Sequence, residues 1–398
     1  MSIFHNIERR AKDPIFGLSY FFQQDPRQHK IDLMVGIYRN QAGRIESMRC
    51  VKQAKQQYLI QEDNPSYLPI RGIDAFIAES QNLILSKPFV ENHKKYLQGF
   101  QTLGGTGALR LGGELLAAQR IDAIHIPNYT WPNHLAIFKA CGMKVSIYPY
   151  YQRQTHTLDF ASMLDDFAKL PKHTPVILHC GCHNPTGCDP THDQWEELSL
   201  LFLKKKLLPF FDIAYQGFDQ GIEEDVWPVR YFAQQGHELL ISHTFSKSLS
   251  LYGQRVGTLH VLLKEQTTGE DLVTVAQDII RTNYSNPPRY GADLASYIMQ
   301  NPDLKQLWVE EMQEMRSHIQ SMRISLFEAF QSLGWEETFL FLKKGTGLFA
   351  LLGLNQKQLN RLIDEYGIYL ISDGRINLSA LQPAHVKDVS QAIIDVLK

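Results

Sequence analysis

The middle of the chain alternates short apolar runs with longer amphipathic segments. Apolar runs that predict strands lie at residues 120–128, 142–150, 174–180, 207–215, 238–246 and 257–263. Segments with helical periodicity lie at residues 108–119, 131–142, 159–170 and 192–206. Because the apolar runs lack strict alternation and are separated by helices, they predict a mostly parallel sheet that is buried on both faces.

A different pattern begins near residue 303. Residues 303–332 predict one long amphipathic helix, and strand-like runs at 346–354 and 375–381 follow it with a short helix between them. The apolar segment 30–38 is expected to join this second unit. The sequence therefore predicts an N-terminal arm (1–12), a small α+β domain (13–45 and 315–398) and a large α/β domain (46–314).

Composition narrows the functional classes. The 398 residues are 44% hydrophobic and 21% charged, with a net charge of −2, which is ordinary for a globular protein. No basic surplus favours nucleic acid or an anionic membrane, and no apolar run reaches membrane-spanning length. The start has no apolar signal region, and an odd, low count of five cysteines favours a reducing compartment. We therefore expect a cytoplasmic protein.

Polar residues that carry chemistry follow several of the predicted strands. In open α/β sheets, ligands bind beyond the carboxyl ends of the strands. Asp212 ends one apolar run, with Tyr215 three residues later, and Lys247 follows another, with Arg255 eight residues later. A glycine-rich turn at residues 104–107 precedes a predicted helix. These positions are expected to meet at one edge of the sheet.

Each of these features has an ordinary structural alternative when it is taken alone. The glycine-rich turn matches neither a P-loop nor a dinucleotide-binding fingerprint, and a carboxylate after a strand is often a helix cap. Together they indicate pyridoxal phosphate: a helix N-terminus with an arginine suits a phosphate, Asp212 can keep a pyridine nitrogen protonated, and Lys247 can form a Schiff base. Asn184 and Tyr215 could hydrogen-bond the phenolic oxygen of the ring.

The stretch "VILHCGCHNPTGCDP" (176–190) holds three of the five cysteines and two histidines. A metal site is one interpretation, but Cys180 and Cys182 lack the C-x2-C spacing of zinc sites, and alternate residues of a strand face opposite sides. We therefore predict no metal site. The cysteines are interpreted as small apolar fillers of a buried strand end, His183 as a neighbour of the site, and His179 as support for the cofactor-ring network.

Ten short motifs occur in order along nearly the whole chain, namely "DPIFGL", "VGIYRNQAG", "YLPIRG", "LGGTGALR", "WPNH", "CHNPTG", "FDIAYQGF", "SKSLSLYGQRVG", "RTNYSNPPRYGA" and "GRINLS". In this order they resemble the fold-type I pyridoxal-phosphate aminotransferases, specifically the aspartate and aromatic amino acid aminotransferase group of class I. The resemblance implies a mostly parallel seven-stranded sheet between helices in the large domain.

The resemblance implies catalytic roles for the residues at the strand ends. Lys247 would carry the Schiff base and act as general base and acid. Asp212 would pair with the pyridine nitrogen, and His134 of "WPNH" would orient that carboxylate from behind. Asn184 and Tyr215 would hold the phenolate of the cofactor.

The resemblance also implies binding roles. Trp131 would stack on the cofactor ring, and Gly36 would lie beside the substrate, whose α-carboxylate Arg375 would clamp with a bidentate contact. Tyr67 and Arg281 would reach into the site of the neighbouring subunit, to the phosphate and to a distal substrate carboxylate respectively, which implies a homodimer with shared sites. The phosphate cup would be formed by Gly105, Thr106, Thr244 and Arg255.

The implied reaction is ping-pong transamination between an aromatic or dicarboxylic amino acid and 2-oxoglutarate. A strict aspartate aminotransferase remains an alternative, because the motifs mix aromatic-type and aspartate-type features. A pyridoxal-phosphate lyase or decarboxylase is a weaker alternative, since it would have less use for Arg281. Two positions depart from the usual pattern: Ala380 stands where relatives usually have glycine, and Thr244 where serine is frequent.

Overall fold

The computed structural model describes residues 4–5, 14–60, 65–265 and 269–398. The predicted N-terminal arm therefore lies outside the described residues, apart from positions 4 and 5. The helices are α1 (Pro14–Gln24), α2 (Arg49–Ile60), α3 (Asp74–Leu85), α4 (Lys87–His93), α5 (Gly104–Ala118), α6 (Asn133–Ala140), α7 (Phe160–Phe167), α8 (His192–Lys205), α9 (Trp227–Gln234), α10 (Gly269–Asn283), α11 (Tyr290–Gln300), α12 (Pro302–Ser332), α13 (Glu336–Phe339), α14 (Phe341–Lys344), α15 (Gln356–Tyr366) and α16 (Val386–Leu397).

The strands are β1 (Ile31–Asp32), β2 (Leu97–Leu103), β3 (Ala123–Pro127), β4 (Lys144–Tyr148), β5 (Tyr151–Gln152), β6 (Thr157–Leu158), β7 (Pro175–His179), β8 (Leu208–Ile213), β9 (Leu239–Thr244), β10 (Val256–Leu262), β11 (Phe349–Leu351), β12 (Ile368–Tyr369) and β13 (Arg375–Asn377). Short 3-10 turns lie at η1 (Tyr252–Gln254), η3 (Leu378–Ala380) and η4 (Pro383–His385).

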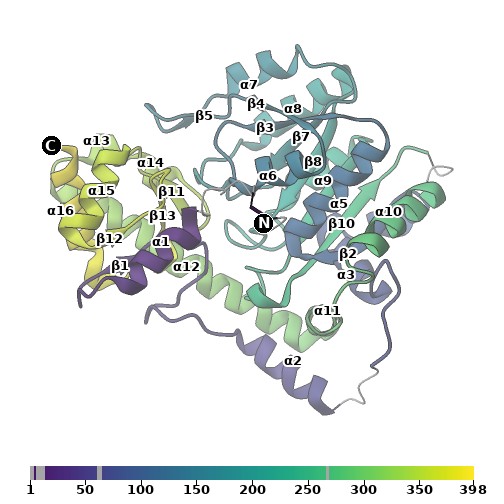
Figure 1. Cartoon of the computed structure of the whole chain (residues 1–398), viewed down its shortest axis with the longest axis horizontal. Coiled ribbons are helices and arrows are strands. Elements are labelled where there is room, and N and C mark those ends of the chain that lie inside the picture. The colour runs from purple at the N-terminus through teal and green to yellow at the C-terminus, as the bar shows by residue number, and fades with distance from the viewer. Residues whose placement is uncertain (1–3, 6–13, 61–64, 266–268) are drawn as a thin grey trace.

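A seven-stranded sheet in the order β2-β10-β9-β8-β7-β3-β4 forms the centre of the larger body (Figure 1). Neighbours among β9, β8, β7, β3 and β4 are parallel, whereas β10 is antiparallel to both β9 and β2. The mostly parallel α/β fold expected from the sequence is confirmed. β10 reverses because residues 245–255 join it to β9 without the crossover helix that a parallel connection needs.

The sheet is buried on both faces, which explains its non-alternating apolar strands. On β8, Phe210 packs into a cluster with residues of α5, α6 and α10, while the next residue, Phe211, packs into a cluster with residues of α7, α8 and α9. Ile177 and Leu178 of β7 divide between the same two clusters. Helices therefore cover both faces, as the sequence predicts for parallel strands.

A smaller body is built from both ends of the chain (Figure 1). β1 pairs in parallel with β12, with Ile31 opposite Ile368, and β11 pairs antiparallel with β13. The run predicted as a strand at 375–381 stops at Asn377, because its side chain donates to the carbonyls of Val35 and Ile37 and accepts from the Ser379 amide, which turns the chain into η3.

The long helix predicted at 303–332 is confirmed as the 31-residue α12. It contacts α2 and α11 of the larger body and α14 and α16 of the smaller one. None of the described helices combines the length and the apolar character needed to cross a membrane.

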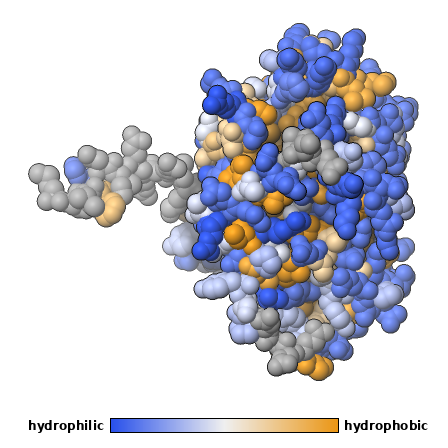
Figure 2. Space-filling model, turned by 90° about the vertical axis from the view of Figure 1, so that its right-hand side faces the viewer, coloured by the Kyte–Doolittle hydropathy of each residue, from blue (hydrophilic) through white to orange (hydrophobic). Residues whose placement is uncertain are grey.

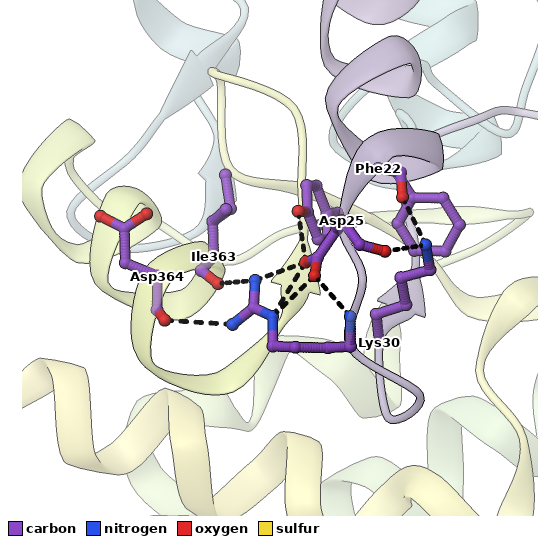
Figure 3. A network of polar contacts seen from close by, with 7 residues as sticks. Phe22, Asp25, Lys30, Ile363 and Asp364 are labelled. Carbon is purple, nitrogen blue, oxygen red and sulfur yellow. Dashed lines mark hydrogen bonds and ion pairs between the residues drawn. The ribbon is translucent and has the colours of Figure 1, made fainter.

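A network of polar contacts holds the end of α1 against α15 (Figure 3). The Asp25 carboxylate accepts hydrogen bonds from Arg27 Nε at 2.9 Å and from the Tyr369 hydroxyl at 2.7 Å. Arg27 also donates to the carbonyls of Ile363 at 2.8 Å and Asp364 at 3.0 Å, near the end of α15. A cation at a helix C-terminus is favourable because it opposes the negative end of the helix dipole.

Replacing Arg27 with alanine is expected to lower the melting temperature at pH 7. The hydrogen bonds from Arg27 hold the pKa of the Asp25 carboxyl well below its usual range. The stabilisation is therefore complete well above the ordinary carboxyl pKa of about 4 and is lost progressively as the pH falls from that value toward the lowered pKa of the folded protein. Thermal melting of both proteins between pH 7 and pH 3 should show a difference that shrinks toward pH 3. The control Arg44→Ala, which breaks an exposed pair with Glu46, should change little.

Candidate active site

Asp212 lies near the carboxyl end of β8, on the sheet face that α6 covers. Its Oδ2 is 3.1 Å from His134 Nε2, and its Oδ1 accepts from the Ser242 hydroxyl at 3.2 Å. Burial alone would raise the pKa of this carboxyl, but the hydrogen bond from His134 and the charge of Lys247 outweigh burial and lower the pKa below its ordinary value. The site therefore holds a buried negative charge at neutral pH.

Two further side chains stand behind this carboxylate. Because an ionised carboxylate can only accept, His134 Nε2 is the donor and its Nδ1 can accept from the Thr130 hydroxyl at 2.7 Å. The same hydroxyl lies 2.9 Å from His179 Nε2. Burial lowers the pKa of His179 to about 3, so this histidine is neutral. Neither Thr130 nor Ser242 was singled out in the sequence, although Ser242 lies two residues before Thr244 on the same face of β9.

Lys247 follows β9, the strand next to β8. Its ammonium group lies 4.9 Å from the centroid of the Tyr215 ring. Burial lowers the pKa of Lys247 to about 8, with Asp212 opposing the shift and Arg255 and Arg375 adding to it. A lysine of this kind loses its proton far more readily than a surface lysine, as nucleophilic and base catalysis require.

The start of α5 meets Arg255. No side chain caps the first turn of this helix, so its amide groups are available to an anion. Gly104 has a φ of +67°, and a Cβ there would lie 2.7 Å from Arg255 Nη2. Gly105 lies against Thr244, because a Cβ placed on this glycine would be 3.5 Å from the Thr244 Cβ. Thr106 belongs to the same turn of α5. These residues form a cradle that suits a phosphate.

Arg375 is buried beside Asn184. Its Nη1 donates to Asn184 Oδ1 at 2.7 Å, and its Nη2 donates to the carbonyl of Met34 at 3.0 Å. Its Nε is buried without a partner among the described residues. The guanidinium carbon lies 4.1 Å above the Phe349 ring, a cation–π contact that fixes the plane of the fork. Burial lowers the pKa of Arg375.

Phe349 also contacts two other predicted site residues. A Cβ on Gly36 would lie 2.8 Å from its ring, and Tyr215 meets the ring edge-on at 5.7 Å. The absence of a side chain at residue 36 therefore lets this segment approach Phe349 and Arg375. Nothing in the local sequence distinguishes Phe349 from the other apolar residues of its strand.

The remaining predicted residues lie in two settings. Trp131 is half-buried directly before α6 and contacts His134 edge-on, with ring centroids 5.5 Å apart. Tyr67 and Arg281 are both exposed, and 90% of Tyr67 is accessible to solvent. Within the described residues, the Arg281 guanidinium makes one hydrogen bond, from Nη1 to Ser285 Oγ. The single chain thus brings together the residues predicted from one subunit and leaves exposed the two predicted to serve another.

The cysteine-rich stretch divides among separate buried contacts. Cys180 Sγ donates to the Asp225 carbonyl at 3.3 Å, and Cys182 packs with the apolar cluster of α12. His183 stacks on Tyr150, with ring centroids 3.9 Å apart. Burial raises the pKa of the Cys180 and Cys182 thiols. Within the described residues, no group of three or more His, Cys, Asp or Glu side chains is placed to hold a metal ion.

Comparison with known proteins agrees with this geometry. The family "Aminotransferase class I and II" matches residues 28–393. The chain is 39% identical to an aspartate aminotransferase of Pseudomonas aeruginosa, over 100% of both chains, and 39% identical to an aromatic-amino-acid aminotransferase of the same species, over 100% of this chain and 99% of that one. The crystal structure of an aromatic-amino-acid aminotransferase from Burkholderia pseudomallei, covalently bound to pyridoxal phosphate, superimposes with a TM-score of 0.96 at 39% identity over 100% of both chains. The chain belongs to the class I and II aminotransferase family.

Proposed function

We propose that the protein uses pyridoxal 5′-phosphate to transfer amino groups between aromatic or dicarboxylic amino acids and 2-oxoglutarate. The observation that carries this proposal is the pairing of the half-buried Lys247, whose pKa is lowered to about 8, with the ionised Asp212 near the ends of adjacent strands. An amine poised to lose its proton beside a fixed negative charge suits this cofactor.

The residues fit the cofactor at both of its polar ends. The uncapped start of α5, with Arg255 behind Gly104, suits the phosphate, and Asp212, held by His134 and Ser242, suits a protonated pyridine nitrogen. When bound there, pyridoxal phosphate supplies an electron sink that stabilises negative charge at the substrate α-carbon. The family relationship and the pyridoxal phosphate bound in the Burkholderia enzyme support this choice of cofactor.

Each protein group then has a defined task. Arg375 binds the substrate α-carboxylate with the N–H groups that its protein contacts leave available, and the Phe349 stack keeps its fork in one plane. Lys247 accepts the proton from the substrate α-carbon and returns a proton later in the cycle. His134 and Thr130 keep Asp212 in its ionised, oriented state.

We further propose a homodimer in which Tyr67 and Arg281 complete the neighbouring site. Both side chains are exposed, and so are Leu59 and Ile60 at the end of α2, at 83% and 77%. Hydrophobic groups occur among hydrophilic ones on the side of the molecule that carries α10 (Figure 2). The same proposal includes two domains, a large one of residues 46–314 and a small one of residues 13–45 and 315–398. It also includes a cytoplasmic location. Movement of the smaller domain over the substrate would exclude water.

Substrate preference depends on which substrate side chain lies next to Arg281. The two Pseudomonas relatives, one named for aspartate and one for aromatic amino acids, are equally similar at 39% identity. Arg281 provides a charge for a distal carboxylate, which favours acceptance of aspartate and glutamate. Its exposed position and single hydrogen bond to Ser285 leave it able to move aside for an aromatic side chain, which favours the dual specificity over a strict aspartate enzyme.

Replacing Arg281 with alanine is expected to lower kcat/KM for aspartate by about 30- to 150-fold, the loss of roughly 2–3 kcal/mol from one charge pair. The value for phenylalanine should change less than about threefold, because no charge is paired. Steady-state assays with 2-oxoglutarate as acceptor measure both. If the wild type turns over phenylalanine at under about a thousandth of the aspartate rate, the dual specificity is wrong and the strict aspartate alternative holds. Release of ammonia or CO2 instead of a new amino acid would indicate a lyase or a decarboxylase.

A further inference from the structure

A serine, a histidine and an aspartate lie in line at the open edge of the large sheet, away from the Lys247 site. Ser146 of β4 and His125 of β3 are opposite each other in the parallel pair, with 2.5 Å between Ser146 Oγ and His125 Nδ1. His125 Nε2 lies 2.6 Å from Asp166 Oδ2 on α7. His125 is buried at 4% exposure, whereas Ser146 is exposed and Asp166 is partly exposed.

The chemistry of the carboxylate fixes the roles in this triad. A carboxylate oxygen accepts, so the His125 tautomer that suits this geometry donates from Nε2 to Asp166 and offers Nδ1 as a lone-pair acceptor. The Ser146 hydroxyl then donates to Nδ1, because its other acceptor, the Ile124 carbonyl, is more distant at 3.4 Å. This is the arrangement of a nucleophile, a general base and an orienting acid.

The edge of the sheet supplies a donor beside the nucleophile. β4 is the outermost strand, and its Lys144 amide donates to the Asp122 carbonyl that precedes β3. Alternate residues of a parallel strand bond to the same neighbour, so the Ile147 amide points away from β3, toward the open edge. An amide directly after the nucleophile is a usual oxyanion donor in serine hydrolases.

We propose that Ser146, His125 and Asp166 form a second, hydrolytic site for small activated esters. Ser146 Oγ forms a bond to the ester carbonyl carbon while its proton passes to His125 Nδ1. The alcohol leaves with that proton and the acyl group stays on Ser146. Water then attacks the acyl carbon, its proton passes to His125 and on to Ser146 Oγ, and the carboxylic acid is released.

Other serine–histidine contacts in the chain provide an internal comparison. Ser199 Oγ lies 2.8 Å from His237 Nε2, and Ser80 Oγ lies 3.0 Å from His260 Nε2. All four of these residues are buried, and neither histidine is paired with a carboxylate among the described residues. Of these three contacts, only the one at Ser146 combines an exposed hydroxyl, a base and an acid.

The test is site-resolved labelling of the full-length protein with a small alkyl fluorophosphonate, followed by peptide mass mapping. One adduct, formed with loss of fluoride, is expected on Ser146 and none on Ser199. The labelling rate should fall at least about 100-fold in His125→Gln and about tenfold or more in Asp166→Asn. Hydrolysis of p-nitrophenyl acetate should fall in the same order, with the lowest rate in Ser146→Ala, and all these variants should keep full transamination activity.

His125→Gln changes a buried residue and could fail to fold. Asp166→Asn changes a partly exposed residue, so it still tests the proposal in that case. An unlabelled Ser146 would overturn the proposal. So would a Ser146 adduct that forms as fast in a folded Asp166→Asn or His125→Gln variant as in the wild type, because the hydroxyl would then react without its base.

Discussion

Replacing Lys247 with alanine is expected to lower kcat/KM for every amino acid substrate by a factor of about 10,000 or more. The variant loses the group that moves the α-proton, and general acid–base catalysis alone contributes up to about 10,000-fold. It also loses the amine that we propose as the covalent attachment point of the cofactor. We do not expect solvent or a surface lysine to replace Lys247, because its pKa is lowered to about 8 and it lies beside Asp212 and Tyr215.

Two measurements check this expectation. Wild-type protein supplied with pyridoxal phosphate should show an absorbance band near the edge of the visible range that shifts when an amino acid is added. Borohydride reduction followed by peptide mass mapping should then find the cofactor on Lys247. The control Lys204→Ala, on the exposed end of α8, should retain both the band and the activity. A reduced cofactor on another lysine of wild-type protein would contradict the assignment.

Replacing Arg375 with lysine is expected to lower kcat/KM by about 1,000-fold for aromatic and dicarboxylic amino acids alike. Lysine keeps the charge but lacks the planar fork that stacks on Phe349 and donates to Asn184 at 2.7 Å. Every α-amino acid carries the same α-carboxylate, so the loss should not depend on the side chain. This uniform loss differs from the selective one expected for Arg281→Ala.

Steady-state kinetics with phenylalanine and aspartate distinguish the two arginines. Arg361→Lys is a suitable control, because that arginine forms an exposed pair with Glu365 on α15. It should leave both substrates within about twofold of the wild type. A loss in Arg375→Lys for aspartate alone would mean that Arg375 binds the distal carboxylate and that the two roles are exchanged.

The parts of the fold that the sequence predicts are those whose signals are local. β8 and β9 both begin with apolar runs, β8 carries Asp212 one residue before its end, and Lys247 lies three residues after the end of β9. The strands and their chemistry can therefore be read from a short window. β2 could not be found in this way, because its sequence LQGFQTL is half polar. Its buried Gln101 is accommodated by hydrogen bonds with the Ile73 amide and the Pro288 carbonyl, which only the folded chain brings near.

The candidate site shows the same division. Two residues within the recognised motifs make contacts in the folded chain, His134 with Asp212 and Asn184 with Arg375, while their roles toward the cofactor stay predictions. Phe349 and Thr130 were missed, because their importance lies in contacts with residues far away in the sequence. Phe349 is an ordinary apolar strand residue until Arg375 stacks on it, and Thr130 gains its place from His179, 49 residues later.

The pairing of the two chain ends has a consequence for how the protein is made. β1 leaves the ribosome early, but its partner β12 lies far along the chain, and the contact of Arg27 with Asp364 spans 337 residues. At about 5–20 residues per second, translation of that interval takes roughly 20–70 s. Throughout that time the first segment has no strand to pair with. The large sheet, whose strands lie between residues 97 and 262, can therefore form first, and the smaller body closes only after β12 has been synthesised.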